Sequence, residues 1–147
     1  MQLLIDADAC PVVAIASDLA NQYGLKCIAF CDTSHVIYRE TMETIVVSQG
    51  ADSVDFVLVN QAQKGDIVVT QDYGLAAMCL AKGAYPIRQD GLIYTQDNIE
   101  GLLQARYTAD KMRKSGGRVK GQKKRTAEDD KRFAQNLEKL ILFLKNN

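Results

Sequence analysis

The sequence lacks the long apolar stretches of membrane proteins, and its start is not that expected of a secreted protein. No run in its 147 residues approaches the length of about 20 apolar residues that crosses a bilayer, and no signal peptide precedes the first apolar segment. It also contains no low-complexity tract and no internal repeat. We therefore expect a cytoplasmic protein with no membrane partner that folds as a single domain over residues 1–147.

Ligands for structural zinc are scarce as well. The four cysteines form no C-x-x-C pair and His35 is the only histidine, so a zinc site is not expected. Thiols buried in a reducing cytoplasm are the simpler interpretation. Cys10 precedes a predicted helix, where a thiol can have a lowered pKa, but no histidine lies near it in the sequence to activate it as a nucleophile. The other cysteines are Cys27, Cys31 and Cys79.

Charge is distributed very unevenly along the chain. The net charge is zero, yet residues 1–105 contain thirteen acidic and five basic side chains, whereas residues 106–125 contain nine basic side chains and one acidic one. A compact basic segment beside an acidic body favours a polyanionic partner, and we expect nucleic acid, RNA in particular. A solvated loop is the alternative interpretation of such a charge run. The basic residues expected to bind nucleic acid are Arg113, Lys114, Arg118, Lys120, Lys123, Lys124 and Arg125.

Apolar periodicity predicts strands that alternate with helices. The expected strands cover residues 3–5, 26–31, 44–48, 66–70 and 85–88, and the expected helices cover residues 12–23, 52–64, 73–82, 97–113 and 127–145. This alternation predicts an α/β fold of three layers, α/β/α, with a mainly parallel sheet of four to five strands and the C-terminal helix docked on the body.

Several helix ends carry recognisable signals. Thr95 and Thr126 are the expected N-caps of the last two helices. For the 52–64 helix, Asp52 is the expected N-cap and Gly65 the expected C′ residue, although residues 56–59 could instead form a strand. Residues 115–124 contain three glycines and should form a flexible or partner-ordered loop.

Four aspartates lie where predicted strands end or helices begin. Asp6 ends the first strand, and Asp8 lies two residues later. Asp72 follows the strand at residues 66–70, and Asp55 lies in the first turn of the 52–64 helix. Because the carboxyl ends of parallel strands share one edge of a sheet, we expect these side chains to converge there. Clustered carboxylates bind Mg²⁺ and Mn²⁺, so the four aspartates are predicted to hold one or two such ions and to catalyse phosphodiester hydrolysis.

Helix capping is the alternative role for three of these residues. Asp8, Asp55 and Asp72 each precede or begin a predicted helix, where a carboxylate can accept backbone N–H bonds or interact favourably with the helix dipole. Spacing alone leaves capping and metal binding open for these three. Asp6 is harder to explain as a cap, because it ends a buried strand and is not the residue nearest to the following helix.

Three motifs of the chain resemble one family. DADACPV at residues 6–12, GDIVVTQDYGLAA at residues 65–77 and RKSGG at residues 113–117, followed by a capped final helix, look like the YaiI/YqxD family of uncharacterised bacterial proteins. That family is similar to the PIN-like superfamily, whose members are mostly Mg²⁺- or Mn²⁺-dependent nucleases. The resemblance implies metal-site roles for Asp6, Asp55 and Asp72, and a supporting role for Thr70 in the T-x-D pattern.

One element of the PIN-like pattern is not evident. Such a nuclease usually has a further acid in a helix of the middle region, and here the nearby acids Glu40 and Glu43 fall in no predicted helix. Either Asp8 substitutes for that acid or the site is incomplete, in which case it would bind metal weakly.

The sequence therefore favours a divalent-metal-dependent nuclease that acts on RNA or single-stranded nucleic acid. One alternative is a nucleic-acid-binding or ribonucleoprotein-associated module with a vestigial metal site. Another is a small-nucleotide binder or hydrolase, which would leave the basic segment without a role.

Overall fold

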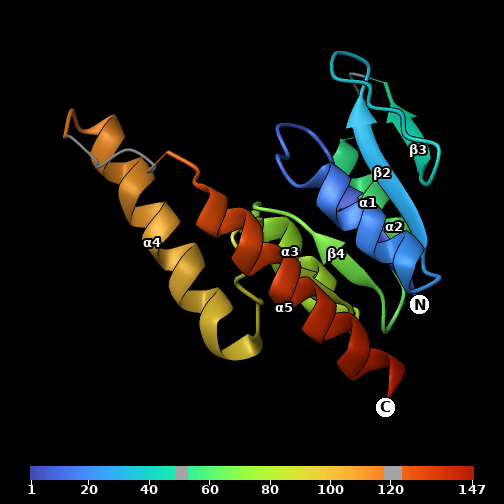
Figure 1. Ribbon diagram of the computed structural model, residues 1–147. Coiled ribbons are helices and arrows are strands. Elements are labelled where there is room, and N and C mark those ends of the chain that lie inside the picture. Colours follow the sequence, from blue (N-terminus) through green and yellow to red (C-terminus); the bar gives the residue numbers. More distant parts are fainter. Residues whose placement is uncertain (49–52, 118–123) are drawn as a thin grey trace.

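Five parallel strands form the centre of the fold (Figure 1). The computed structural model describes residues 1–48, 53–117 and 124–147. Within these residues the strands lie in the order β3-β2-β1-β4-β5, and every neighbouring pair is parallel. The parallel sheet predicted from the alternation of strands and helices is confirmed. The strands are β1 (Gln2–Asp6), β2 (Lys26–Asp32), β3 (Glu43–Val47), β4 (Ile67–Val69) and β5 (Tyr85–Ile87).

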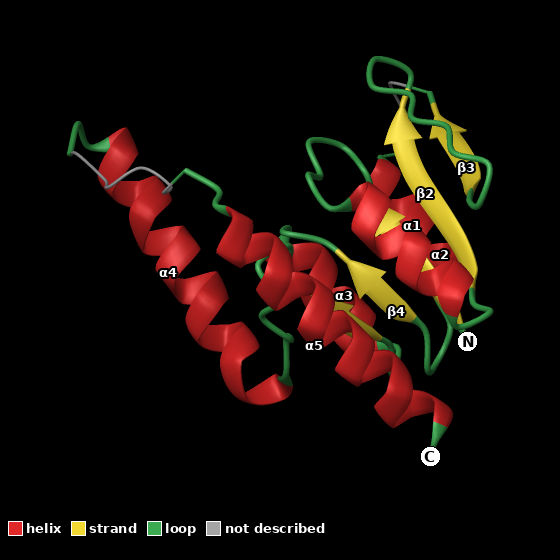
Figure 2. Cartoon of the chain, viewed as in Figure 1, coloured by secondary structure: helices red, strands yellow, loops and turns green. Residues whose placement is uncertain are grey.

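Helices cover both faces of this sheet and give the three layers that were expected (Figure 2). α1 and α5 pack on one face, and α2 and α3 pack on the other. α4 packs against α3 rather than directly on the sheet. The helices are α1 (Val13–Gln22), α2 (Val54–Gln61), α3 (Tyr73–Ala81), α4 (Gln96–Lys114) and α5 (Ala127–Lys145). No helix in the described part of the chain is long and apolar enough to cross a membrane.

Strand β1 shows why the sheet is covered on both sides. Its three central residues have no exposed surface. Because successive side chains of a strand point to opposite faces, Leu3 and Ile5 join the layer under α1 and α5, whereas Leu4 joins the layer under α2 and α3. A strand buried on both faces has a continuous apolar sequence, which is how this central strand could be predicted.

The C-terminal helix is docked on the body, as predicted. Thr126 forms the N-terminal capping box of α5, and Phe133 and Leu137 on its apolar face are fully buried against the sheet layer. The hydroxyl of Tyr23, just after α1, donates a hydrogen bond to Glu138 Oε2 at 2.8 Å. Apolar burial and this polar contact together hold α5 beside α1.

The predicted ends of α2 are wrong, although the choice of a helix over a strand is confirmed. Ser53 is the N-cap, and its hydroxyl accepts a backbone N–H of the first turn; Asp52 lies outside the described residues. The helix ends at Gln61 because the next residue is extended. Gly65 is therefore not its C′ residue, and its N–H instead donates to Gly83 O at 3.0 Å in the turn that leads into β4.

Helix α4 leaves the body as it extends. Thr95 caps it through a capping box, and Ile99 in its first turns is buried. Further along, Leu103, Tyr107 and Met112 are all exposed. Figure 1 shows the C-terminal half of α4 standing apart from the sheet.

Candidate functional site

The carboxyl edge of the sheet has a switch point between β1 and β4. The chain runs from β1 outward to β2 and β3, and then returns across the sheet to β4 and β5. In open α/β sheets, ligands bind in the crevice outside the carboxyl ends of the strands at such a point. Asp6 ends β1, and Thr70 directly follows β4 on the other side of the switch point.

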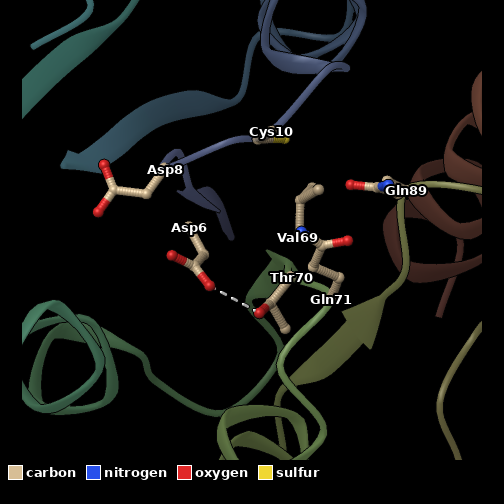
Figure 3. A pocket seen from close by; sticks show the side chains of 7 residues that line it. All are labelled: Asp6, Asp8, Cys10, Val69, Thr70, Gln71 and Gln89. Atoms are coloured by element: carbon tan, nitrogen blue, oxygen red, sulfur yellow. Dashed lines mark hydrogen bonds between the residues drawn. The ribbon is translucent and has the colours of Figure 1, made fainter. Parts of the chain in front are cut away.

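Thr70 holds the two sides of the switch point together. Its hydroxyl donates to Asp6 Oδ2 at 2.8 Å (Figure 3) and accepts the backbone N–H of Asp72 at 3.0 Å. Its carbonyl oxygen accepts the hydroxyl of the buried Tyr94 at 3.0 Å. Because Thr70 is only 3% exposed and paired in this way, it fixes both the Asp6 carboxylate and the backbone that carries Asp72.

Asp72 caps a helix and also belongs to an acidic cluster with Asp6 and Asp55, which is called the acidic cluster below. It is the N-cap of α3, and its Oδ1 accepts the Leu75 N–H at 3.1 Å. Its negative charge also raises the pKa of Asp6 and of Asp55, so its carboxylate lies near both. The two roles that the sequence left open for Asp72 are therefore compatible.

Burial and mutual repulsion make two of the carboxyl groups weaker acids than an ordinary aspartate. Burial raises the pKa of Asp6 to about 6; the Thr70 hydrogen bond opposes this shift. The charges of Asp72 and Asp8 contribute to the same rise. Burial also raises the pKa of Asp55 to about 6, helped by the charge and hydrogen bond of Asp72 and by the charge of Asp6. Each group is thus harder to ionise than an aspartate in water.

The cluster has no basic partner among the described residues. None of the ion pairs of lysine or arginine within these ranges involves Asp6, Asp55 or Asp72. Several carboxylates held close together without a counter-charge are stabilised by protons or by a cation. Oxygen ligands of this kind suit a hard divalent ion.

Asp8 joins a second group of side chains that could hold a metal. Among the described residues, Asp8, Asp32 and His35 form the group whose ligand atoms all lie within 4.8 Å of one another. The Asp8 carboxylate accepts the Asp32 N–H at 3.4 Å, and His35 Nδ1 lies 3.4 Å from Asp32 Oδ1. The four aspartates that the sequence predicts as metal ligands do not form so compact a group. In Figure 3 the Asp8 carboxylate points away from Thr70. Its charge still raises the pKa of Asp6, so Asp8 lies between the two groups.

Sequence reasoning missed Asp32 and His35. The signal that could have found them is the position of Asp32 at the carboxyl end of β2, the strand next to β1. The group also has an explanation that needs no metal, because Asp32 Oδ1 accepts the N–H groups of Ser34 and His35 at 2.8 and 3.1 Å within its own turn. The His35 side chain is 68% exposed.

A cleft opens from the acidic cluster toward α4. Its volume is about 1010 Å³, and its walls come from the carboxyl edge of the sheet, the loop after β5, one face of α4 and the start of α5. A smaller pocket of about 10 Å³, with room for about one water molecule, lies between Asp6, Asp8 and Thr70 (Figure 3). Charged and aromatic residues that line the large cleft include Asp6, Asp72, Arg88, Arg106, Tyr107 and Arg125.

Cys10 lines the smaller pocket, but its thiol is not activated. Burial raises the pKa of Cys10 to about 11, opposite in direction to the lowered pKa considered from the sequence. Helix α1 begins only at Val13, so the thiol does not belong to its first turn. The structure therefore argues against a nucleophilic role for Cys10.

Three basic residues predicted to bind nucleic acid are exposed. Arg113 and Lys114 lie in the last turn of α4, and Lys124 lies shortly before α5. Arg113 donates to Asp110 Oδ1 at 3.1 Å, and exposed pairs of this kind hold a side chain only weakly. The predicted residues that lie outside the described ranges are Arg118, Lys120 and Lys123.

Arg125 differs from these because it is part of the fold. Its Nε donates to Asp130 Oδ1 at 2.8 Å, and its Nη2 donates to the carbonyl oxygen of Gln89 at 2.8 Å. These bonds tie the start of α5 to the loop after β5. Arg125 also lines the cleft.

Neither acid of the middle region reaches the site. Glu43 begins β3, two strands away from β1 and in register with Ile28 of β2, and its Oε2 lies 3.5 Å from Lys26 Nζ. Glu40 lies in the turn that precedes β3. The acid that a PIN-like nuclease usually has in this region is therefore not supplied by either residue.

The fold and the site define a class: a three-layer α/β/α protein with an acidic cleft at the switch point of a parallel sheet. The profile of the YaiI/YqxD family, which is described as uncharacterised, matches residues 4–142 of the chain. The chain belongs to this family, and the resemblance drawn from its motifs is confirmed.

Relatives are similar over nearly their whole length. A UPF0178 protein of Ruminiclostridium cellulolyticum is 48% identical over 145 residues, which cover 99% of this chain and 93% of its own. One of Clostridium acetobutylicum is 44% identical over 144 residues, 97% of each chain, and one of Natranaerobius thermophilus is 41% identical over the full length of both. Their names state no activity. No solved structure matches the chain.

Proposed function

We propose that the protein is a divalent-metal-dependent nuclease that hydrolyses phosphodiester bonds of RNA or single-stranded nucleic acid. The observation that carries this proposal is the cluster of Asp6, Asp55 and Asp72 at the switch point, with no basic partner among the described residues. The resemblance of the family to PIN-like nucleases supports the same assignment.

The donor set suits Mg²⁺ or Mn²⁺. Carboxylate oxygens are the preferred ligands of these ions, and Mg²⁺ usually keeps several of its waters. Carboxylates that are too widely spaced to share a bare ion can therefore hold one partly through water. When bound, the ion would stabilise negative charge on the phosphate and lower the pKa of a water molecule.

The residues of the chain would have distinct tasks in this reaction. Asp6 would anchor the cation, since the Thr70 hydroxyl fixes the orientation of its carboxylate. Asp55 at the start of α2 and Asp72 at the start of α3 would supply further carboxylates to the cation. Asp8 would supply another from the loop after β1. Because ligand carboxylates must be ionised, the raised pKa values of Asp6 and Asp55 predict metal binding that strengthens as the pH rises through about 6.

Replacing Asp6 tests the proposal. In calorimetric titration with Mn²⁺, Asp6→Asn should bind the ion at least about tenfold more weakly than the wild type. In the same buffer, cleavage of a labelled single-stranded RNA should be lost, while the circular dichroism spectrum stays unchanged. The matched control is Asp18→Asn, which removes an exposed carboxylate of α1 that pairs with Arg39. This control should bind Mn²⁺ and cleave RNA as the wild type does. Cleavage by Asp6→Asn at the wild-type rate would contradict the assignment.

A second candidate function is a nucleic-acid-binding or ribonucleoprotein-associated module with a vestigial metal site. The observation that favours it is geometric: the predicted aspartates do not form one compact group, and neither Glu40 nor Glu43 adds a ligand. This function predicts RNA binding that depends on salt, requires no Mn²⁺ and is unchanged in Asp6→Asn.

A further inference from the structure

One face of α4 forms the outer wall of the cleft. Leu103, Arg106, Tyr107 and Asp110 all line it, and their spacing places them on a single side of the helix. The opposite wall contains Asp6 and Asp72. A chain molecule bound at the acidic cluster can therefore extend through the same cleft to this face of α4.

Tyr107 presents an aromatic ring to the cleft that the protein itself does not use. The residue is 61% exposed, and its side chain has no ring contact and no hydrogen bond to the other described residues. The other tyrosines near the cleft are occupied: Tyr73 and Tyr94 pack edge to face with centroids 5.9 Å apart, and the Tyr94 hydroxyl donates to Thr70 O. A ring left in water on the wall of a polar cleft is suited to stack on a flat ligand.

Arg106, the neighbour of Tyr107, keeps its guanidinium donors available. Two other arginines of the cleft are engaged by the fold. Arg88 donates twice to Asp90, at 2.8 and 2.7 Å, and Arg125 is tied to Asp130 and Gln89 as described above.

The side chain of Arg106 is 63% exposed, and its contact within the described residues is with Asp110, at 3.7 Å. That distance is too long for a good hydrogen bond. Arg106 can therefore turn to an anion in the cleft.

We propose that Tyr107 and Arg106 form a subsite for one unpaired nucleotide, with the base stacked on the Tyr107 ring and a backbone phosphate bound by Arg106. The inference rests on the proposed function in that the ligand is a nucleic acid whose backbone reaches the acidic cluster. Stacking on an aromatic side chain needs a free base face, and within a duplex both faces are covered by neighbouring base pairs. The subsite thus selects single-stranded over double-stranded substrate.

Binding measured without hydrolysis tests the subsite. The probe is a fluorescein-labelled single-stranded RNA of about ten nucleotides, titrated in EDTA and followed by anisotropy. Tyr107→Ala should weaken binding by about tenfold, whereas Tyr107→Phe, which keeps the ring, should bind as the wild type does. The matched control is Tyr38→Ala, because Tyr38 is 75% exposed and lies outside the cleft. This control should have no effect.

Abasic nucleotides link the effect to a base rather than to general packing. A single abasic nucleotide is placed at each position of the RNA in turn. At one position the missing base should weaken binding to the wild type about as much as Tyr107→Ala does. The same abasic RNA should bind Tyr107→Ala no more weakly than the complete RNA does. The wild type should bind a duplex of the same sequence more weakly than it binds the single strand. Wild type and Tyr107→Ala should bind that duplex with equal affinity.

The outcomes separate this inference from the proposed function. If Tyr107→Ala binds the RNA as tightly as the wild type, or if the wild type binds no RNA, the subsite is refuted even where Asp6 proves to be catalytic. If the wild type shows the coupling between Tyr107 and one base but cleaves nothing in Mn²⁺, the subsite stands and the hydrolytic function fails.

Discussion

Burial of the Asp6 carboxylate affects the stability of the protein at neutral pH. Burial raises its pKa from 3.8 to about 6, against the opposing effect of the Thr70 hydrogen bond. The folded protein therefore binds this proton more tightly than the unfolded chain does. The resulting stabilisation is fully present below about pH 4 and is lost as the pH rises through about 6.

Asp6→Asn should therefore stabilise the metal-free protein at neutral pH. The amide oxygen can still accept the Thr70 hydroxyl, but it carries no charge that must be buried. We expect the free energy of unfolding to rise by roughly 1–3 kcal/mol at neutral pH in EDTA, and the difference to shrink toward zero near pH 4. Urea denaturation of both proteins across this range measures the effect.

The exposed carboxylate of Asp18 again provides the control. Asp18→Asn should change the free energy of unfolding by less than about 1 kcal/mol at any pH, because exposed ion pairs contribute little. An Asp6→Asn protein that is no more stable than the wild type at neutral pH would show that its carboxylate is not buried at a cost. Saturating Mn²⁺ should favour the wild type instead, since an ion stabilises only the protein that binds it.

At the scale of elements, the position of α5 depends on a close approach to the turn after β5. Gly91 has a φ of 96°, a conformation that side chains rarely allow, and its carbonyl oxygen accepts Asn136 Nδ2 at 2.9 Å. A Cβ at Gly91 would lie 2.8 Å from the backbone oxygen of Arg132 in α5. Both the turn and the helix therefore require glycine here.

Gly91→Ala should lower the free energy of unfolding by about 2 kcal/mol or more, because backbone strain of about 1 kcal/mol adds to a clash with the α5 backbone. Thermal melts and hydrogen exchange of α5 amides would detect the loss. The matched control is Gly101→Ala in α4, where a Cβ meets nothing within 4 Å and alanine is the better helix former, so stability should not fall. An unchanged melting temperature for Gly91→Ala would mean that α5 can shift freely.

Local signals were enough to predict the elements, but not which elements become neighbours. The apolar run of β1 and the capping residues Thr95 and Thr126 are read within a few residues of the chain, and the structure confirms all three. The pairing of β1 with β4, which brings Thr70 to Asp6, depends on the path that the chain takes back across the sheet. No local pattern encodes that path.

The errors in the prediction have the same origin. Asp52 and Ser53 are both good capping residues, and local chemistry does not choose between them. Asp32 and His35 belong to the carboxyl edge only because β2 lies beside β1. The division of the acids into two adjoining groups, with Asp8 between them, likewise depends on how three strands and a turn are arranged in space.

At the scale of the whole molecule, acidic and basic side chains gather on different elements. The acidic cluster lies at the edge of the sheet, whereas the last turn of α4 carries Lys111, Arg113 and Lys114, and Lys124 and Arg125 directly precede the Thr126 cap of α5. A polyanion would be repelled by the first region and attracted by the second. RNA held by the basic side could therefore reach the acidic side only where a cation neutralises it, which couples the proposed metal site to substrate placement.

The basic side should govern the salt dependence of RNA binding. Substituting glutamine for the exposed Lys111, Lys114 and Lys124 should weaken binding of single-stranded RNA and flatten its dependence on salt. Each phosphate contact to a single strand contributes about 0.7 to the slope of log affinity against log salt, so losing up to three contacts should reduce the slope by up to about 2. Anisotropy titrations in EDTA at several KCl concentrations give this slope directly.

A second triple variant distinguishes local contacts from net charge. Glutamine in place of Lys26, Lys64 and Lys139 removes the same charge from exposed positions that lie neither in α4 nor in the segment before α5. If only long-range attraction mattered, both variants would lose a similar amount of affinity at low salt. That loss would largely disappear near 0.1 M salt, where exposed charges more than about 10 Å apart are screened. Direct phosphate contacts at the end of α4 would instead reduce the slope in the first variant only. Equal slopes in the two variants would remove this basic segment from the proposed binding surface.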